Sequence, residues 1–300
     1  MRVDPNYVFN LTQSVSASSA AEQKLTNQLS SGLRVSSLSD DPVAVAQNVL
    51  LASSISKADS FTQTSTREQA VLQATDSALG EVVSNVTSAI TLSVQANAGT
   101  LSASNLKSIG EQLSGIRDQV VSLANTGYLG TYLFGGSQGG TPPFTLATST
   151  DPATVTYNGD SVTQSVVTPD QQKIQVNLPG SAIFQASGAD LLGALNQVVS
   201  DVSNGASGTA LASDTAALTT ALGNVTSQRA VLGSSLSRLT STTTYSNTQE
   251  AQLTAQQSTL LSSDTAAVAT GLTTAETQHT ALLNVIAGLD KTNLFDYLQG

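Results

Sequence analysis

LSSDTAAVATGLTTAETQHTALLNVIAGL, residues 261–289, has the most regular apolar pattern in the chain. Apolar or small residues recur in it at steps that alternate between four and three. They are Leu261, Thr265, Val268, Leu272, Ala275, His279, Leu282, Ile286 and Leu289. This spacing is typical of the a and d positions of a coiled coil. The stretch therefore predicts a helix with a single apolar seam.

The same helical pattern extends upstream, because residues 211–288 contain no proline. A continuous helix of that length would measure about 115 Å at ~1.5 Å per residue. A compact chain of 300 residues has a radius of gyration of only about 19 Å. Either the helix breaks, at Gly233 or Gly271, or the protein is a rod. We expect a rod whose exposed seam is covered by other molecules.

A second, weaker seam lies near the other end of the chain. Its steps also alternate between four and three, and its members are Leu11, Val15, Ser18, Glu22, Leu25, Leu29 and Gly32. Pro5 suits the start of this helix, and Gly32 suits its left-handed C-terminal cap. The simplest topology pairs the first helix with the last.

Two more long helices are predicted between these ends. SDDP at 39–42 is a helix start, because an aspartate caps free backbone N–H groups and proline suits the first turn. The helix after it should span 43–98, and the next one 103–125. The inward positions expected in the first of these are Val49, Ile55, Leu72, Leu79, Val83, Val86, Ile90 and Val94.

The middle of the chain has a different character. Residues 141–187 hold short runs rich in valine, threonine and aromatics, separated by turn signals such as Asn158-Gly159-Asp160. They predict a small β insert, followed by a helix at 189–204. The glycine-rich run 135–140 lacks the Gly-Lys-Ser/Thr of a phosphate-binding loop. We expect it to be a flexible hinge between the helices and the insert.

The predicted fold is therefore mainly α with a small β insert. It is an elongated rod of long antiparallel helices, with a terminal coiled coil and a helical bundle that carries a β domain. Residues 1–42 and 265–300 would form the terminal coiled coil. Residues 43–140 and 189–264 would form the helical rod, and residues 141–188 the outer β domain.

Composition excludes several kinds of function. The chain has no cysteine and one histidine, which leaves no thiol nucleophile and no Ser-His-Asp or zinc site built in the usual way. A net charge of −10 argues against nucleic acid as a partner. No apolar run of about 20 residues predicts a membrane span, and the N-terminus does not resemble a secretory signal. We expect no enzyme activity, no cofactor and no metal.

Individual polar residues have simple structural interpretations. His279 lies on the C-terminal seam, and we interpret it as an interhelical contact whose protonation loosens the terminal helices in acid. Asp40 and Asp41 are interpreted as helix caps rather than as half of a metal site. Arg117 and Asp118 are expected to be an ordinary solvated pair.

Several motifs resemble bacterial flagellins and their hook-associated junction proteins, and together they span almost the whole chain. LSSGLRV at 29–35 and SDDP at 39–42 resemble the N-terminal block of that family. LANTG at 123–127 and YLFGG at 132–136 resemble the segment after its helical hairpin. In the middle, YNGD at 157–160 and VNLPG at 176–180 resemble the β domain of the junction proteins. NLFDYL at 293–298 resembles the C-terminal tail of the same proteins.

The resemblance implies a structural subunit of the bacterial flagellum that joins hook to filament and templates flagellin polymerisation. The alternative within the family is a filament flagellin. The resemblance also implies a homo-oligomeric ring or tube outside the cell. It further implies export through the flagellar type III apparatus without a cleaved signal. The implied partners are the other junction protein, flagellin and an export chaperone. Outside the family, a secreted enzyme on a helical scaffold and a filamentous adhesin remain alternatives.

We expect the two apolar seams and the tail to form the assembly interface. The predicted interface residues are Leu11, Val15, Leu25, Leu29, Val268, Leu272, His279, Leu282, Ile286, Leu289, Phe295 and Leu298. The many serines and threonines of these helices make them marginal alone, so they need packing partners.

Overall fold

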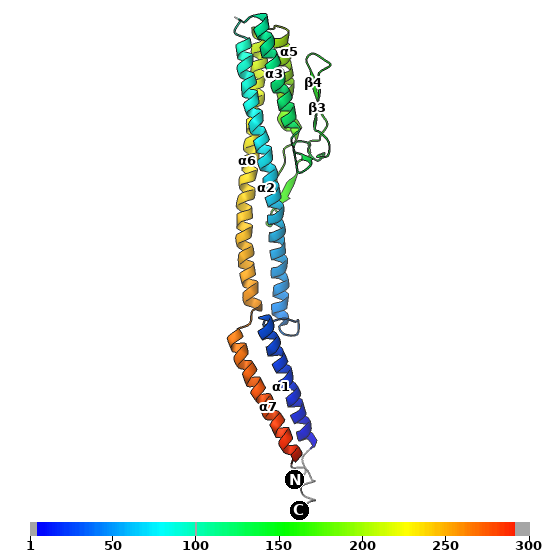
Figure 1. Cartoon of the computed structure of the whole chain (residues 1–300), viewed down its shortest axis with the longest axis vertical. Helices are drawn as coiled ribbons and strands as arrows, with labels where there is room; N and C mark the ends of the chain where they lie inside the picture. The colour runs from blue at the N-terminus through cyan, green and yellow to red at the C-terminus, as the bar shows by residue number, and fades with distance from the viewer. Residues whose placement is uncertain (1–4, 100, 292–300) are drawn as a thin grey trace, which may run out of the picture. The chain divides into compact units, whose positions relative to one another are not determined.

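The computed structural model describes residues 5–99 and 101–291 (Figure 1). The chain forms two compact units. The terminal unit comprises residues 1–56 and 249–300, and the central unit comprises residues 57–248. The helices are long, as predicted, and the fold is mainly α with a small strand-containing region. The main helices are α1 (Pro5–Ser31), α2 (Pro42–Ala96), α3 (Ala103–Ala124), α5 (Leu191–Ser203), α6 (Thr209–Leu261) and α7 (Thr265–Lys291).

The long C-terminal stretch is broken, but at neither of the predicted glycines. Gly233 lies inside α6 and Gly271 inside α7. The break falls between Leu261 and Thr265, where Asp264 Oδ1 accepts hydrogen bonds from the N–H groups of Ala266 and Ala267 at 3.0 and 3.1 Å. A capping aspartate supplies acceptors that begin a new helix. A glycine inside a helix only weakens it, so the cap outweighs both glycines.

Side chains of α2 and α6 meet along the central unit. Ser93 Oγ lies 2.6 Å from Thr215 Oγ1, Gln69 Nε2 donates to Thr243 Oγ1 at 3.2 Å, and Arg229 binds Asp76. The partner number falls as the α2 number rises, so the two helices run antiparallel. Leucines and valines of the two helices are fully buried, among them Leu79, Val82, Val86, Leu211, Leu218 and Val225.

α3 and α5 complete the helical part of the central unit and lie side by side in Figure 1. A Cβ added at Gly110 in α3 would lie 3.0 Å from Ser203 Oγ in α5, so the glycine permits a close approach of the two helices. The buried residues of α3 include Ile109, Leu113 and Val120.

The strands form four antiparallel two-stranded ladders between α3 and α5. The pairs are β1 (Gly127–Tyr128) with β2 (Thr131–Tyr132), β3 (Phe144–Ala147) with β4 (Thr154–Tyr157), β5 (Ser165–Val167) with β6 (Lys173–Gln175), and β7 (Gln185–Ala186) with β8 (Ala189–Asp190). A short helix, α4 (Gly180–Phe184), precedes β7. β3 to β6 fall within the strand-like runs of the sequence. β3 packs on α3, and β4 packs on α5.

An aromatic cluster joins the strands to the helices. Phe134 and Phe184 are fully buried with ring centroids 5.1 Å apart at 87°, and Phe144 stacks obliquely on Tyr157 at 5.0 Å. Edge-to-face pairs at such distances stabilise a core beyond the area they bury. Tyr157 Oη lies within hydrogen-bond distance of the Phe134 carbonyl oxygen, at 2.9 Å.

Part of the glycine-rich run 135–140, which we expected to be a flexible hinge, is held by contacts with Asp160. The side chain of Asp160 accepts hydrogen bonds from both N and Oγ of Ser137. Gly136 has a φ of +70°, and a Cβ there would overlap Asp160. Glycine is needed because no side chain fits and the backbone is left-handed, not because the loop must move.

Three smaller expectations also fail. Val49 and Val94, predicted to point inward, are 61% and 57% exposed. Arg117, predicted to be solvated, is 7% exposed. It donates hydrogen bonds to Asp118 Oδ1 at 2.8 and 3.0 Å and to Ser114 Oγ at 3.0 Å, which satisfy the buried guanidinium.

Candidate functional site

The terminal helices α1 and α7 pack against each other, as the two seams predicted (Figure 1). The methyl groups of Leu25 lie 3.6 and 3.7 Å from the position of a Cβ at Gly271. Closer to the chain ends, His279 Nδ1 lies 3.3 Å from Glu22 Oε1. The order of these contacts makes the pair antiparallel.

The seam residues of this pair are only partly covered. Ala275 is the one buried apolar residue of α1 and α7 within their described side chains. The partly buried seam positions are Leu11, Val15, Ser18, Glu22, Leu25, Val268, Leu272, His279, Leu282 and Ile286. Two helices alone cannot enclose a seam, because each buries only one narrow stripe against the other.

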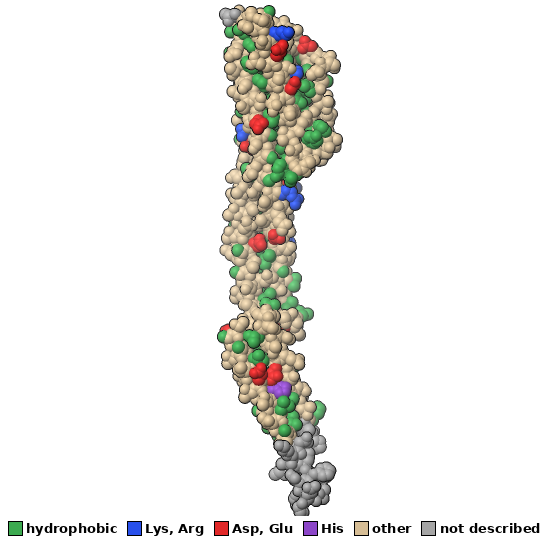
Figure 2. Space-filling model, in the orientation of Figure 1, with side chains coloured by type: hydrophobic (Ala, Val, Ile, Leu, Met, Phe, Trp, Pro, Cys, Tyr) green, Lys and Arg blue, Asp and Glu red, His purple; other side chains and the backbone are tan. Residues whose placement is uncertain are grey.

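Large apolar side chains also remain outside the seam. Tyr7 is 49% exposed and Phe9 is 69% exposed on α1, while Leu283 and Val285 are 47% and 45% exposed on α7. Single exposed apolar residues are ordinary, but these four lie on one helix pair whose seam is only partly covered. Charged side chains are sparse and scattered on the face shown in Figure 2. The pair therefore carries exposed apolar surface.

The segment that follows α1 and the segment that precedes α7 are joined by backbone hydrogen bonds. Arg34 N donates to the Leu261 carbonyl at 2.7 Å, and Ser263 N donates to the Gly32 carbonyl at 2.9 Å. Leu33 and Ser262 form an isolated antiparallel bridge between these bonds. Gly32 has a φ of +69°, which fits the left-handed cap predicted for the end of α1. The end of α1 and the start of α7 are thus held together by this short antiparallel backbone ladder.

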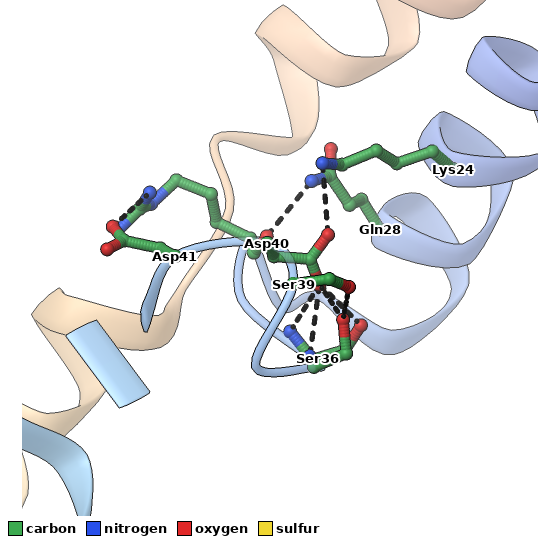
Figure 3. A network of polar contacts seen from close by, with 8 residues as sticks. Lys24, Gln28, Ser36, Ser39, Asp40 and Asp41 are labelled. Carbon is green, nitrogen blue, oxygen red and sulfur yellow. Dashed lines mark hydrogen bonds and ion pairs between the residues drawn. The ribbon is translucent and has the colours of Figure 1, made fainter. Parts of the chain in front are cut away.

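Asp40 organises the loop between α1 and α2 (Figure 3). Its carboxylate accepts hydrogen bonds from the N–H groups of Ser36 and Ser37 at 3.2 and 3.0 Å, and it pairs with Lys24 Nζ at 3.0 Å. The lysine first, and then the serine donors, hold the pKa of Asp40 well below its usual range. Asp40 therefore fixes the loop between α1 and α2.

Asp41 caps α2 as predicted, since the Ala44 N–H donates to its Oδ1 at 3.0 Å. Arg34 lies between this cap and the end of α6. Its guanidinium nitrogens are 3.3 and 3.4 Å from Asp41 Oδ2 and 3.2 Å from the Leu260 carbonyl oxygen. The bond to Ala44 is the main cause that lowers the pKa of Asp41. Both aspartates of the SDDP motif therefore have structural contacts: Asp40 in the loop between α1 and α2, and Asp41 at the start of α2.

The structure places most of the predicted interface residues on α1 and α7, and their role in assembly stays a prediction. Partly buried side chains are those of Leu11, Val15, Leu25, Val268, Leu272, His279, Leu282 and Ile286, whereas Leu29 is 38% exposed. The side chain of Leu289 is outside the described part of the chain, as are Phe295 and Leu298. Sequence reasoning did not single out Tyr7, Phe9, Leu283 and Val285, which are exposed large apolar residues off the seam.

The described residues include no cluster of three or more His, Asp or Glu side chains that could hold a metal ion. Two open grooves are present, one of about 530 Å³ between α2 and α3 and one of about 510 Å³ beside Arg34 and Leu260. Among the helices described, none is both long and apolar enough to cross a bilayer.

Comparisons with known proteins identify the family. Residues 6–139 match the bacterial flagellin N-terminal helical region, and residues 215–298 match the bacterial flagellin C-terminal helical region. The flagellar hook-associated protein 3 of Salmonella typhimurium is 30% identical over 257 residues, which cover 80% of this chain and 81% of that protein.

Solved structures with the same fold include two flagellar proteins. A flagellar hook-associated protein-3 from Legionella pneumophila aligns with a TM-score of 0.62 at 15% identity, over 70% of this chain and 98% of that one. FlgL from Xanthomonas campestris aligns with a TM-score of 0.59 at 17% identity, over 69% of this chain and 98% of that one. The family matches, with the Salmonella relative, show that this chain belongs to the bacterial flagellin family.

Proposed function

We propose that this chain is a structural subunit of the bacterial flagellum that joins hook to filament and presents the surface on which flagellin begins to polymerise. The observation that carries this proposal is the 30% identity to a hook-associated protein 3 over 80% of the chain. The uncovered apolar surface of the α1–α7 pair supports it independently, because a protein that works as a monomer gains nothing from such a surface.

The assembly surface has two layers in this proposal. The seam residues hold α1 against α7, and the exposed Tyr7, Phe9, Leu283 and Val285 contact neighbouring copies. Full burial of one large apolar side chain contributes about 1.5–3 kcal/mol. Loss of side-chain freedom offsets part of that gain, so several such residues must act together.

The proposed division of labour follows the sequence. The terminal segments 1–42 and 265–300 form the contacts between copies, and Leu289, Phe295 and Leu298 extend that surface. Segments 43–140 and 189–264 form the helical body, and 141–188 face outward. The partners are further copies in a ring or tube, the other junction protein, flagellin, and the chaperone and type III apparatus for export.

A gene deletion tests the proposal. A strain that lacks this chain should release flagellin monomers into the medium, because the filament has no base on which to grow. If the chain were the filament subunit, the same strain would carry bare hooks and junctions with no flagellin released. Normal swimming of the deletion strain would exclude both.

Complementation of that strain locates the assembly surface. A chain that lacks residues 1–35 or 265–300 should fail to restore filaments. A double substitution of the exposed pair, Phe9→Ser with Leu283→Ser, should fail as well. As a matched control, Thr26→Ser with Thr273→Ser changes two exposed polar positions on the same helices and should restore filaments. Normal assembly by either truncated chain would remove the proposed role of the ends.

A further inference from the structure

The chain contains two Asn-Gly pairs in its central unit, Asn158-Gly159 and Asn204-Gly205, and both asparagines are exposed. Asn-Gly is the dipeptide most prone to deamidation, because glycine has no side chain to hinder its backbone nitrogen. That nitrogen attacks the carbonyl carbon of the asparagine side chain. The rate in a folded protein depends on how firmly the fold holds both groups, so the two pairs provide an internal comparison.

Asn204-Gly205 is held on both sides at the end of α5. Asn204 caps this helix, and Gly205 N donates a hydrogen bond to the Val202 carbonyl oxygen at 3.2 Å. The side-chain amide of Asn204 donates to Asp151 Oδ2 at 3.0 Å. The nitrogen that would attack and the amide that would leave are both bonded. Deamidation of Asn204 therefore requires the end of α5 to open first.

Asn158-Gly159 follows β4 and is held on one side only. The side-chain amide of Asn158 donates to Thr145 Oγ1 at 2.8 Å. Within the described residues, Gly159 N has no hydrogen-bond partner. A Cβ at Gly159 would lie 2.8 Å from the Gly135 carbonyl oxygen and closer still to Tyr157 Oη, so the fold requires glycine here. The fold thus keeps the reactive dipeptide and leaves its attacking nitrogen unbonded.

We propose that Asn158 is a site of spontaneous deamidation, which loosens the glycine-rich run 135–140 as the chain ages. Gly159 N forms a bond to Asn158 Cγ, and the side-chain nitrogen leaves as ammonia with the proton from Gly159 N. Water then opens the resulting succinimide at either carbonyl, which gives aspartate or isoaspartate. Each event adds one negative charge to a chain whose net charge is −10. The proposal does not depend on the proposed junction function.

Isoaspartate at this site would act on the glycine-rich run through Asp160. It inserts an extra methylene into the main chain two residues before Asp160. The Asp160 carboxylate accepts hydrogen bonds from Ser137 N and Val162 N at 2.8 and 3.0 Å, and its carbonyl oxygen lies 2.8 Å from Tyr157 Oη. These bonds join residues 135–140 to the end of β4. A longer backbone between β4 and Asp160 displaces the carboxylate and releases Ser137.

Mass spectrometry of peptides from the full chain tests the reactivity. Samples are incubated at pH 8, either folded or unfolded in guanidinium chloride. The folded rate at each asparagine is divided by its own unfolded rate, which removes the effect of neighbouring residues in the sequence. The normalised rate at Asn158 should exceed that at Asn204 about ten-fold, because Asn204 reacts only after its hydrogen bonds break. Equal normalised rates, or a faster Asn204, would overturn the proposal.

Variants test the local contacts and the effect on the loop. Thr145→Val, at an exposed position of β3, removes the acceptor of the Asn158 amide and should raise the rate there about two- to five-fold, with no change at Asn204. Asn158→Gln is the matched control, because glutamine cyclises far more slowly. Hydrogen–deuterium exchange of residues 135–140 should be faster in aged parent chains than in fresh ones, and unchanged by ageing in Asn158→Gln. Unchanged exchange in parent chains converted at Asn158 would overturn the effect on the loop.

Discussion

The terminal and central units are built from similar helices but bury very different amounts of apolar surface. In the terminal unit, the buried apolar residues among those described are Val35, Ala44 and Ala275. The central unit has one continuous core from Phe61 to Leu239, which includes the aromatic cluster and many fully buried leucines and valines. Burial of apolar surface therefore stabilises the central unit much more than the terminal unit.

This difference indicates which part of the chain has enough buried apolar surface to be stable as a monomer. A core with many fully buried side chains supplies its own stability. A two-helix contact with a partly exposed seam is marginal, because helices in water draw most of their stability from tertiary packing. We therefore expect the central unit to respond strongly to core substitutions, and the terminal unit to respond mainly when copies assemble.

The largest effect should come from the aromatic cluster. Phe134→Ala removes a fully buried ring that packs at 5.1 Å on Phe184 and should cost about 3–5 kcal/mol in the free energy of unfolding. Urea denaturation followed by circular dichroism measures the change. Phe9→Ala is the matched control in the terminal unit. Phe9 is 69% exposed, so the monomer should change by less than about 0.5 kcal/mol while filament assembly falls.

This pair of variants can break the comparison. A Phe9→Ala chain as destabilised as Phe134→Ala would mean that the exposed ring is already packed in the monomer. A Phe134→Ala chain of normal stability would mean that the central core tolerates a cavity of that size.

The next effect concerns the packed glycine loop. At Gly136 an alanine would meet both a left-handed backbone and the side chain of Asp160, which together should cost about 2–4 kcal/mol. Gly130 also has a positive φ, of +81°, but open space around it. Gly130→Ala should therefore cost only about 1 kcal/mol. Equal losses in the two variants, measured by urea denaturation, would show that the contact with Asp160 adds nothing.

Most of the helical architecture could be predicted from local pattern. The three- and four-residue steps predicted α1, α2 and α3 to within a few residues, because an apolar stripe must face a partner and caps mark the ends. β3 to β6 were found from their composition and turn residues. The break before α7 was misplaced, although Ser262-Ser263-Asp264 is a capping signal, because glycine was weighted above it.

Contacts between distant segments could not be predicted from the chain alone. A helix of 55 residues drifts by about 20° per heptad against a fixed repeat, so the inward face assigned to α2 was wrong at Val49 and Val94. Arg117 occupies a core-facing position only because α3 is covered on that side. Likewise, the contacts of Ser137 with Asp160 and of Glu22 with His279 depend on tertiary structure.

A smaller effect in the central unit should depend on pH. Burial, and then the neighbouring Asp201 carboxyl, raise the pKa of Asp214 to about 6. A raised pKa favours the protonated form in the folded state. The contribution of Asp214 to stability is therefore complete below about pH 4, near the ordinary value for aspartate, and is lost as the pH rises through about 6.

Asp214→Asn should remove that loss. The variant should have a higher urea midpoint than the parent at pH 7.5 and nearly the same midpoint at pH 4. Glu81→Gln, an exposed position on α2, provides the charge-matched control and should leave the pH profile unchanged. An unaltered profile in Asp214→Asn would show that the two carboxyl groups do not interact.

The smallest effect should come from the ion pair between Arg229 and Asp76. Arg229 Nε lies 2.9 Å from Asp76 Oδ1, but the two side chains are 33% and 42% exposed. Solvent screens such a pair, so Asp76→Asn should cost only about 0.2–1 kcal/mol, again measured by urea denaturation. Asp59→Asn, an exposed position on the same helix, is the control. A cost above about 2 kcal/mol would mean that polar contacts, and not the apolar core alone, distinguish the central unit from the terminal one.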